Sequence, residues 1–194
     1  MKNILKSAAH ILFKLLALPI YCLFWLLSLI GSADGLFSSF VQFFSLFPGM
    51  FGVYLRAAFY RYTMTYCDND VVIGFGTLFS QQDTEIYSGT YIGPQCNIGK
   101  SKINRNCLIG SGVHILSGKG QHNFDDIDIP LKDQGGKFEK VTIGEDSWLG
   151  NGSIIMASVG KKCVVAAGSV VVNEVPDYAI VAGNPAKVIK SRKV

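Results

Sequence analysis

The chain has few residues of the kinds that build metal and redox centres. Its 194 residues include only three histidines and five cysteines, and no two cysteines stand as a CxxC pair. This spacing argues against zinc ribbons and dithiol redox motifs. A zinc lyase would need several histidines converging between subunits, and outside the apolar N-terminus only His114 and His122 are present. We therefore expect no metal site.

A nucleic-acid signature is also missing. The net charge of +4 is modest, and no basic cluster with interleaved aromatic residues occurs. The chain is nevertheless 49% hydrophobic, and this excess is unevenly spread. The length suits one domain plus an appendage. We expect no nucleic-acid partner, and two parts of different composition, residues 1–66 and residues 67–194.

A hydrophobic residue recurs at about every sixth position through most of residues 73–175. A period of six fits neither a helix nor a simple strand, and a hexapeptide repeat is typical of a parallel β-helix. Roughly three hexads make one coil, with the aliphatic side chains stacked inside the prism. An antiparallel β-sandwich with Gly-rich turns fits the repeat length less well. The repeated positions are Ile73, Phe79, Ile86, Ile92, Ile98, Ile103, Ile109, Ile115, Ile143, Leu149, Ile155, Val159, Val165 and Val171.

Small residues often follow the aliphatic position by four places. Three of the five cysteines, Cys96, Cys107 and Cys163, occupy this position. Cysteine packs as a small apolar side chain, and thiols stay reduced in the cytosol. We interpret these three residues as buried, reduced fillers of a cytosolic domain.

The first 66 residues are apolar in three stretches. Residues 11–30 carry one charge, Lys14, and are about long enough to cross a bilayer core as a helix, with Pro19 as a kink. A second stretch covers residues 36–47. The third, from Met50 to Tyr66, has the pattern of an amphipathic interfacial helix.

Positive charges flank both ends of these stretches, which favours the cytoplasm for both ends. The sequence therefore predicts a helical hairpin that enters a bacterial inner membrane and returns, with its turn near Asp34 and the β-helix on the cytoplasmic face. Two alternatives remain. One is a secretory signal peptide with Lys2 and Lys6 before the apolar run and Gly31-Ser32-Ala33 as the cleavage site. The other is a set of helices that only cap the prism end in a soluble trimer.

The repeat is interrupted once, between Ile115 and Ile143. A long loop projecting from a regular scaffold is usually functional, so residues 116–142 are the candidate catalytic loop. His122 is the loop's one group suited to proton transfer near neutral pH. Its acidic neighbours Asp125, Asp126 and Asp128 have the chemistry to orient the imidazole or raise its basicity.

Four motifs resemble those of the hexapeptide-repeat acyltransferases, and within them the xenobiotic and sugar O-acetyltransferase group. The resemblance covers about residues 70–190. The motifs are Gly-Gln-His-Asn-Phe-Asp at 120–125, Val-Thr-Ile-Gly-Glu-Asp-Ser-Trp-Leu-Gly at 141–150, Val-Ala-Ala-Gly-Ser-Val-Val at 165–171 and Val-Ala-Gly-Asn-Pro-Ala-Lys-Val-Ile at 181–189.

The resemblance implies a left-handed parallel β-helix with acetyl-CoA as co-substrate. It implies that His122 acts as the general base on an acceptor hydroxyl, a role that typically contributes about 10²–10⁴-fold. A backbone N–H would stabilise the oxyanion. Asn123, Asp125 and the exterior residue His114 are candidates for contacts with the acceptor.

In the family, acetyl-CoA lies in a groove between neighbouring prisms of a trimer. Carried over by position, Trp148 and Asn151 line the pantetheine path and Ala167 and Gly168 offer backbone groups to it. Relatives often have a basic residue where Asn173 stands, which puts a phosphate contact there in doubt. A basic C-terminal tail suits a polyanionic co-substrate. The full set of cofactor-binding candidates is Trp148, Asn151, Ala167, Gly168, Val172, Asn173, Lys187 and Lys190.

These observations predict an acetyl-CoA-dependent O-acetyltransferase. The apolar N-terminus suggests a homotrimer at the lipid bilayer and an acceptor that is itself membrane-bound, such as a glycolipid or polyprenyl-linked sugar of surface polysaccharide biosynthesis, because co-localisation raises the effective concentration of the acceptor. The alternatives are an acetyltransferase of a soluble sugar, amino acid or antibiotic, and a non-catalytic membrane scaffold.

Overall fold

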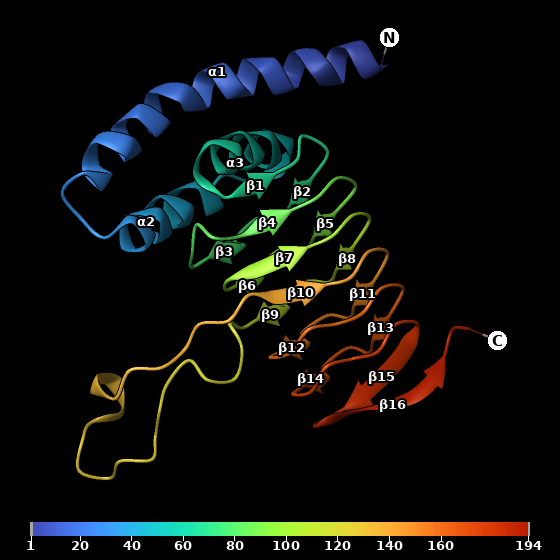
Figure 1. The fold of residues 1–194 in the computed structure, drawn as a ribbon. Helices are drawn as coiled ribbons and strands as arrows, with labels where there is room; N and C mark the ends of the chain where they lie inside the picture. The colour runs from blue at the N-terminus through green and yellow to red at the C-terminus, as the bar shows by residue number, and fades with distance from the viewer. Residues whose placement is uncertain (1, 194) are drawn as a thin grey trace.

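The protein is described by a computed structural model that covers residues 2–193. Three helices lie at one end of a stack of short strands, and a strand hairpin closes the opposite end (Figure 1). One long excursion leaves the stack between β9 (His114–Ile115) and β10 (Val141–Ile143), where the repeat is interrupted.

The strands form a β-helix of about six turns, as the hexad repeat predicts. Parallel pairing arranges them in three sheets of four, seven and five strands, and only the final pair, β15 with β16, is antiparallel. The other strands are β1 (Tyr66–Cys67), β2 (Val72–Ile73), β3 (Leu78–Phe79), β4 (Glu85–Ile86), β5 (Tyr91–Ile92), β6 (Asn97–Ile98), β7 (Ser101–Ile103), β8 (Leu108–Ile109), β11 (Trp148–Leu149), β12 (Ile154–Ile155), β13 (Val164–Val165), β14 (Val170–Val171), β15 (Ala179–Gly183) and β16 (Ala186–Ser191).

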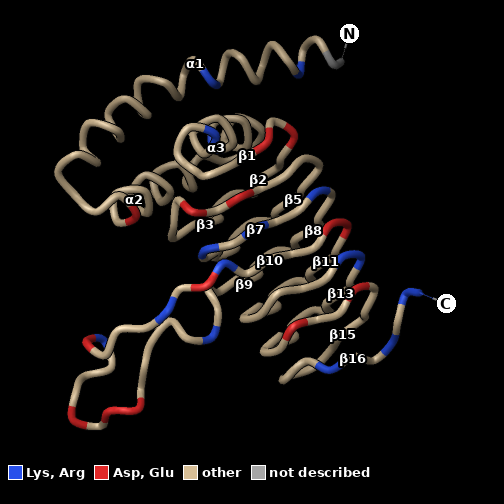
Figure 2. The backbone as a smooth tube through the Cα atoms, in the orientation of Figure 1, with Lys and Arg blue, Asp and Glu red and all other residues tan. Residues whose placement is uncertain are grey.

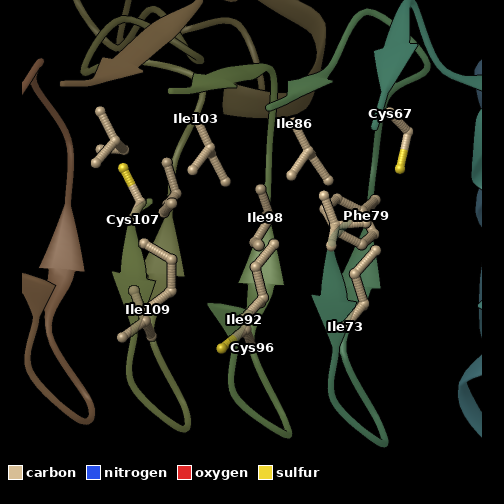
Figure 3. Packing of buried hydrophobic residues seen from close by; sticks show 14 of the residues in the cluster. Cys67, Ile73, Phe79, Ile86, Ile92, Cys96, Ile98, Ile103, Cys107 and Ile109 are labelled. Carbon is tan, nitrogen blue, oxygen red and sulfur yellow. The ribbon is translucent and has the colours of Figure 1, made fainter. Parts of the chain in front are cut away.

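The predicted aliphatic series forms the core. Every one of its 14 positions, from Ile73 to Val171, is at most 2% exposed. Residues from successive coils form a row along the stack, as Ile73, Ile92 and Ile109 do in Figure 3. The small fillers Cys96, Cys107 and Cys163 are buried free thiols, as predicted. The stack of coils therefore encloses one continuous apolar column.

The three outer faces of the prism differ in chemistry. The four-stranded sheet presents Glu85 and Lys102, which pair across adjacent strands. The five-stranded sheet presents Asn97 beside His114. The seven-stranded sheet instead presents an exposed apolar row in strand register: Val72, Tyr91, Leu108 and Trp148.

Two helices cap the first coil. Helix α2 (Ala33–Ser45) begins after Ser32, whose hydroxyl accepts a hydrogen bond from the Gly35 N–H at 3.3 Å, and helix α3 (Gly49–Thr63) follows it. Phe44 of α2 stacks on Phe59 of α3 with ring centroids 4.3 Å apart, and Tyr60 of α3 meets Phe79 of the coil. The cap therefore continues the core of the β-helix.

The cap differs from the membrane hairpin that the sequence predicts. Asp34, the expected tip of the hairpin, accepts a hydrogen bond from the Gln82 N–H at 2.9 Å and so lies against the coil. Arg56, expected on an interfacial helix, is fully buried. Helices α2 and α3 bury aromatic residues against each other and against the open end of the prism, so in this structure they pack as a cap on the first coil.

Helix α1 (Lys2–Ser28) lies across α3 at the outer side of the cap (Figure 1). Ala17 and Phe24 on one side of α1 are buried. Phe24 packs edge-on against Phe40 and Phe59, and Tyr21 stacks on Tyr62. Within the described residues, Ile4–Ser28 is the one segment long and apolar enough to cross a membrane, judged by length and composition.

Candidate active site

The excursion is an arm formed by residues 116–142, and its root is held by hydrogen bonds between the outgoing and the returning segment of the chain. The Lys137 N–H donates to the Gly120 carbonyl at 2.6 Å, and the Glu139 N–H donates to the Ser117 carbonyl at 2.8 Å. Its outer part contains one turn of 3-10 helix, Leu131–Asp133. The arm projects well clear of the stack (Figure 1).

The Gln134 side chain organises the outer part of the arm. Its amide donates to the carbonyls of Asp126 and Ile129 at 2.6 and 2.7 Å, and its carbonyl accepts from the Asp126 N–H at 3.2 Å. The Asp126 carboxylate in turn accepts from the N–H groups of Asp128 and Ile129. These local bonds give a polar segment a defined shape without a core of its own.

The predicted base, His122, is exposed on this arm. Its neighbour Asn123 is committed to the arm, because its side-chain amide donates to the Gln134 carbonyl at 3.0 Å and its N–H donates to the Gly135 carbonyl. Asn123 therefore positions the chain beside His122. Asp125 is exposed on the same arm.

His114 lies on the five-stranded face, in a depression of about 320 Å³ at the root of the arm. Gln121, the residue before His122, lines the same depression. The structure thus brings the arm that carries His122 to the face that carries His114. The other lining residues are Ser80, Asn97, Gly99, Ile115, Leu116 and Ser117.

Three predicted cofactor residues share one corner of the prism, between the seven-stranded and five-stranded faces. The Gly168 N–H donates to the Asn151 carbonyl at 2.9 Å, and Asn151 Oδ1 accepts from the Ser111 N–H at 3.0 Å. The Asn151 side chain therefore stabilises the corner. Ala167 is exposed beside Gly168, and its N–H has no recorded acceptor within residues 2–193. That N–H is available to a ligand carbonyl.

Close stacking explains why Gly150 stands at this corner. A Cβ added there would lie 2.4 Å from the Ala167 nitrogen, closer than any real contact. Gly150 follows β11, whose exposed Trp148 belongs to the adjacent apolar row. Trp148 and the Ala167–Gly168 corner therefore belong to adjacent coils, because β11 pairs with β13 and Gly150 lies against Ala167.

The remaining cofactor candidates lie toward the C-terminal end of the stack. Asn173 follows β14 and lines a pocket of about 280 Å³ with Lys119 and Lys140 from the arm. Val172, between β14 and Asn173, is half-buried. Lys187 and Lys190 are exposed on β16, which is the edge of the seven-stranded sheet. Basic groups are therefore present at the β16 edge of the seven-stranded sheet and beside Asn173.

The sequence alone did not single out Gln121, Asn97 or Lys119. A signal for Asn97 was nevertheless present, because Asn97 and His114 each stand one place before a core isoleucine, an exterior position of successive coils. Among the described residues, no group of three His, Cys, Asp or Glu side chains is arranged to hold a metal.

Comparison with known proteins identifies the repeat. Residues 140–172 match the hexapeptide repeat of succinyl-transferase. A probable macrolide acetyltransferase of Lysinibacillus sphaericus is 36% identical over 118 residues, which are 53% of this chain and 63% of that protein. A probable acetyltransferase of Mycobacterium tuberculosis is 41% identical over 75 residues, 38% of this chain and 25% of that protein. The chain thus spans less than two thirds of the length of these relatives.

Solved structures share the fold at low identity. A hexapeptide-repeat acetyltransferase of Vibrio cholerae, complexed with acetyl-CoA, matches with a TM-score of 0.68 and 19% identity over 81% of this chain and 86% of its own. A galactoside acetyltransferase in complex with coenzyme A matches with a TM-score of 0.66 and 19% identity, over 84% of each chain. The chain therefore contains hexapeptide repeats, is similar over part of its length to these acetyltransferases, and shares its fold with the two solved structures.

Proposed function

We propose that this protein transfers an acetyl group from acetyl-CoA to an acceptor hydroxyl, with His122 as the general base. The supporting observation is the arm, which carries an exposed imidazole out from a face that holds His114. The neighbouring corner offers the uncommitted N–H of Ala167 beside the exposed Trp148. An apolar wall with a few polar groups suits a pantetheine chain.

The proposed chemistry uses one imidazole twice. His122 takes the proton of the acceptor hydroxyl as its oxygen forms a bond to the thioester carbonyl carbon. The oxyanion of the tetrahedral intermediate needs an N–H donor. When the C–S bond breaks, the electron pair leaves with the CoA sulfur, and the imidazolium returns the proton to that sulfur. The acetyl ester and free CoA thiol are the products.

Substitution of His122 tests this role. We expect His122→Ala to lower kcat by about 10²–10⁴-fold, the usual contribution of a positioned base. Release of the CoA thiol from acetyl-CoA, followed with each acceptor, gives the rate. Lys132→Gln, an exposed change on the 3-10 turn of the same arm, is the control and should keep wild-type activity. A His122→Ala protein with wild-type turnover would exclude the mechanism.

We propose that the working form is a homotrimer. The apolar row on the seven-stranded face leaves Leu108 46% and Trp148 49% exposed, and the arm exposes Phe124 and Ile127. Apolar surface in such amounts on two separate features favours burial against another copy of the chain. A neighbouring prism would also supply the second wall of a groove along the corner that holds Ala167.

We further propose that α1 holds the protein on the cytoplasmic face of the inner membrane. Its outer side exposes a nearly continuous apolar surface: Ile4, Leu5, Ile11, Leu12, Leu15, Leu16, Leu18, Leu23, Trp25, Leu26 and Leu27. Its inner side keeps Phe13, Tyr21 and Phe24 packed on the cap. A helix with one side on protein along its whole length suits a position in the membrane plane.

Two acceptor classes follow from different observations. The apolar face of α1 favours a membrane-bound glycan or polyprenyl-linked sugar of surface polysaccharide biosynthesis. The relatives named as macrolide and chloramphenicol acetyltransferases favour a soluble small molecule. Equal turnover of a lipid-linked sugar and its free sugar would support the second class. Mass spectrometry of surface glycans and lipid-linked sugars, with and without the protein, would reveal the first as a difference of one acetyl group.

A further inference from the structure

A second pocket, of about 300 Å³, lies between α1 and α3, among residues that have no part in the proposed acetyl transfer. Its residues on α1 recur at i, i+3, i+4 and i+7 and so lie on one flank of that helix. Arg61 comes from α3, and Asn69 follows β1. The lining residues are Ser7, His10, Ile11, Lys14, Arg61 and Asn69.

The two cations of this pocket lack carboxylate partners. Within residues 2–193, neither Lys14 nor Arg61 forms an ion pair. The Lys14 ammonium lies 5.6 Å from the centroid of the Tyr62 ring. The neighbouring acids are used elsewhere, because Asp70 pairs with Lys6 and Asp68 accepts from the Tyr66 hydroxyl and the Asp70 N–H. Two half-buried positive charges therefore face the cavity without a direct ion pair, and the nearby Asp68 carboxylate, whose pKa Arg61 helps to lower, compensates them only in part.

The rim of the pocket is apolar. Ile11 lines it and is 63% exposed, and Leu15, the next residue after Lys14, is 61% exposed. Figure 2 shows how few charges interrupt α1. A ligand that fits both the cationic lining and the apolar rim needs an anionic group joined to an apolar group. Inorganic phosphate has no apolar group.

We propose that the pocket binds the phosphate of an anionic phospholipid headgroup and so fixes α1 in the bilayer interface. The Arg61 guanidinium presents a planar fork that suits phosphate oxygens, and Lys14 adds a compact charge. The Ser7 hydroxyl and the Asn69 amide are further donors. This inference rests on the membrane association proposed above and is independent of acetyl transfer.

Vesicle binding by the full-length protein tests the site. The probes are vesicles of pure phosphatidylcholine and vesicles of phosphatidylcholine with about one quarter phosphatidylglycerol. The anionic phosphatidylglycerol gives the second vesicles a negative surface potential, as anionic lipids do in a cytoplasmic leaflet. We expect tighter partitioning onto the anionic vesicles. A cation near such a surface is worth about 1 kcal/mol, so Arg61→Gln and Lys14→Gln should each weaken this partitioning about fivefold. Lys14→Arg should retain it.

Arg105→Gln is the matched control, because it removes the same charge from an exposed corner of the coil and should bind like the wild type. Wild-type binding by Arg61→Gln, or an equal loss in Arg105→Gln, would overturn the pocket but leave membrane association standing. Wild-type protein that binds neither vesicle would overturn both. Thermal stabilisation by inorganic phosphate that Arg61→Gln abolishes, without preference for anionic vesicles, would assign the pocket to a free phosphate instead. The transfer assay measures the enzymatic proposal separately.

Discussion

Arg56 joins three segments of the chain through one buried side chain. Its Nε and Nη2 donate to the Ile73 carbonyl of β2 at 3.1 and 2.9 Å, and its Nη1 donates to the carbonyls of Phe44 and Phe47 at 3.3 and 2.6 Å. Burial lowers the pKa of this guanidinium, yet arginine remains charged in proteins. The carbonyls near the end of α2 therefore stabilise a cation that has no acid beside it.

Removal of this side chain should detach the cap from the coil. Arg56→Met leaves the carbonyls of Ile73 and Phe47 without a donor among the described residues, while the Phe44 carbonyl still accepts from the Phe47 N–H at 3.4 Å. Each lost partner costs about 1–3 kcal/mol. We expect a loss of about 3 kcal/mol or more in the free energy of unfolding, measured by urea denaturation. Tyr60→Phe is the neighbouring control, because the buried Tyr60 hydroxyl has no hydrogen-bond partner among the described residues, and its loss should leave stability unchanged or slightly higher. An Arg56→Met midpoint equal to that of the wild type would contradict this account.

Thiol chemistry separates one cysteine from the other four. Cys22 is exposed on α1, whereas burial raises the pKa of Cys67 to about 12 and that of Cys107 to about 11. The thiolate is the reactive form, so the buried thiols should resist alkylation near pH 8. We expect a water-soluble maleimide to modify Cys22 alone in the folded protein and all five cysteines in denaturant.

The same reagent reports on the membrane. Cys22 lies among the exposed apolar residues of α1, so bound vesicles should protect it from the maleimide. Cys22→Ser provides the blank. Mass spectrometry counts the adducts. Unchanged labelling of Cys22 on vesicles that have bound the protein would show that another surface faces the lipid.

At the scale of elements, the coils were predictable and the cap was not. The buried positions of Ile92 and Val165 follow from the six-residue period, which is typical of a parallel β-helix. Strands of only two residues could therefore be placed correctly from the sequence. Helix α3 carries Arg56 and Arg61 with almost the same local pattern, yet one is buried and the other lines a pocket. That difference depends on the Ile73 carbonyl 17 residues away, a contact that periodicity does not encode.

The candidate site divides in the same way. The break in the repeat predicted the arm that carries His122, and the resemblance to the hexapeptide-repeat acyltransferases suggested Ala167 and Gly168, which lie together at one corner. The hydrogen bonds of the Asn123 and Asn151 side chains were not predictable, because each is formed with a backbone group that only folding brings close. The resemblance assigns both residues to ligand contacts, and in the structure each side chain also forms a hydrogen bond to nearby backbone.

The return of the arm is held by an ion cluster that should respond to acid. Lys140 pairs with Glu85 at 2.8 Å and with Asp83, and its hydrogen bonds hold the pKa of both carboxyl groups below their ordinary values. Because these pKa values are lowered on folding, the stabilisation is complete above their ordinary values of about 4 and is lost as the pH falls through the lowered values.

Lys140→Met should therefore reduce stability at neutral pH and have a diminishing effect in acid. Asp83 is 45% exposed, so we discount each pair to about 0.5 kcal/mol. Thermal unfolding from about pH 7 to about pH 3 should show a gap in Tm between wild type and variant that is constant above about pH 5 and shrinks below about pH 4. A gap that persists undiminished at the lowest pH would mean that Lys140 acts through packing. Lys132→Gln, on the outer arm, should show no gap.

At the scale of the whole molecule, each surface has a separate proposed task. The helical end carries the exposed apolar side of α1 and the cationic pocket between α1 and α3, and the opposite end carries the lysines of β16 (Figure 2). Between the two ends, one face is charged, one is apolar and one holds His114 at the root of the arm. A stack of coils built from one repeat can differ so strongly between faces because only the interior positions are constrained by packing.

The apolar face yields the prediction for assembly. A charge placed within the row of Val72, Tyr91, Leu108 and Trp148 would be buried without a partner in a trimer, at a cost of several kcal/mol. We expect Leu108→Glu to be a folded monomer by light scattering, with acetyl transfer lost because no second prism completes the groove. Thr142→Glu places the same charge on the four-stranded face, in register with Lys102, and should remain trimeric. A trimeric mass in Leu108→Glu would mean that the row faces solvent or lipid in the assembly. A monomeric wild type would mean that the arm and the acetyl-CoA site of the same chain act together.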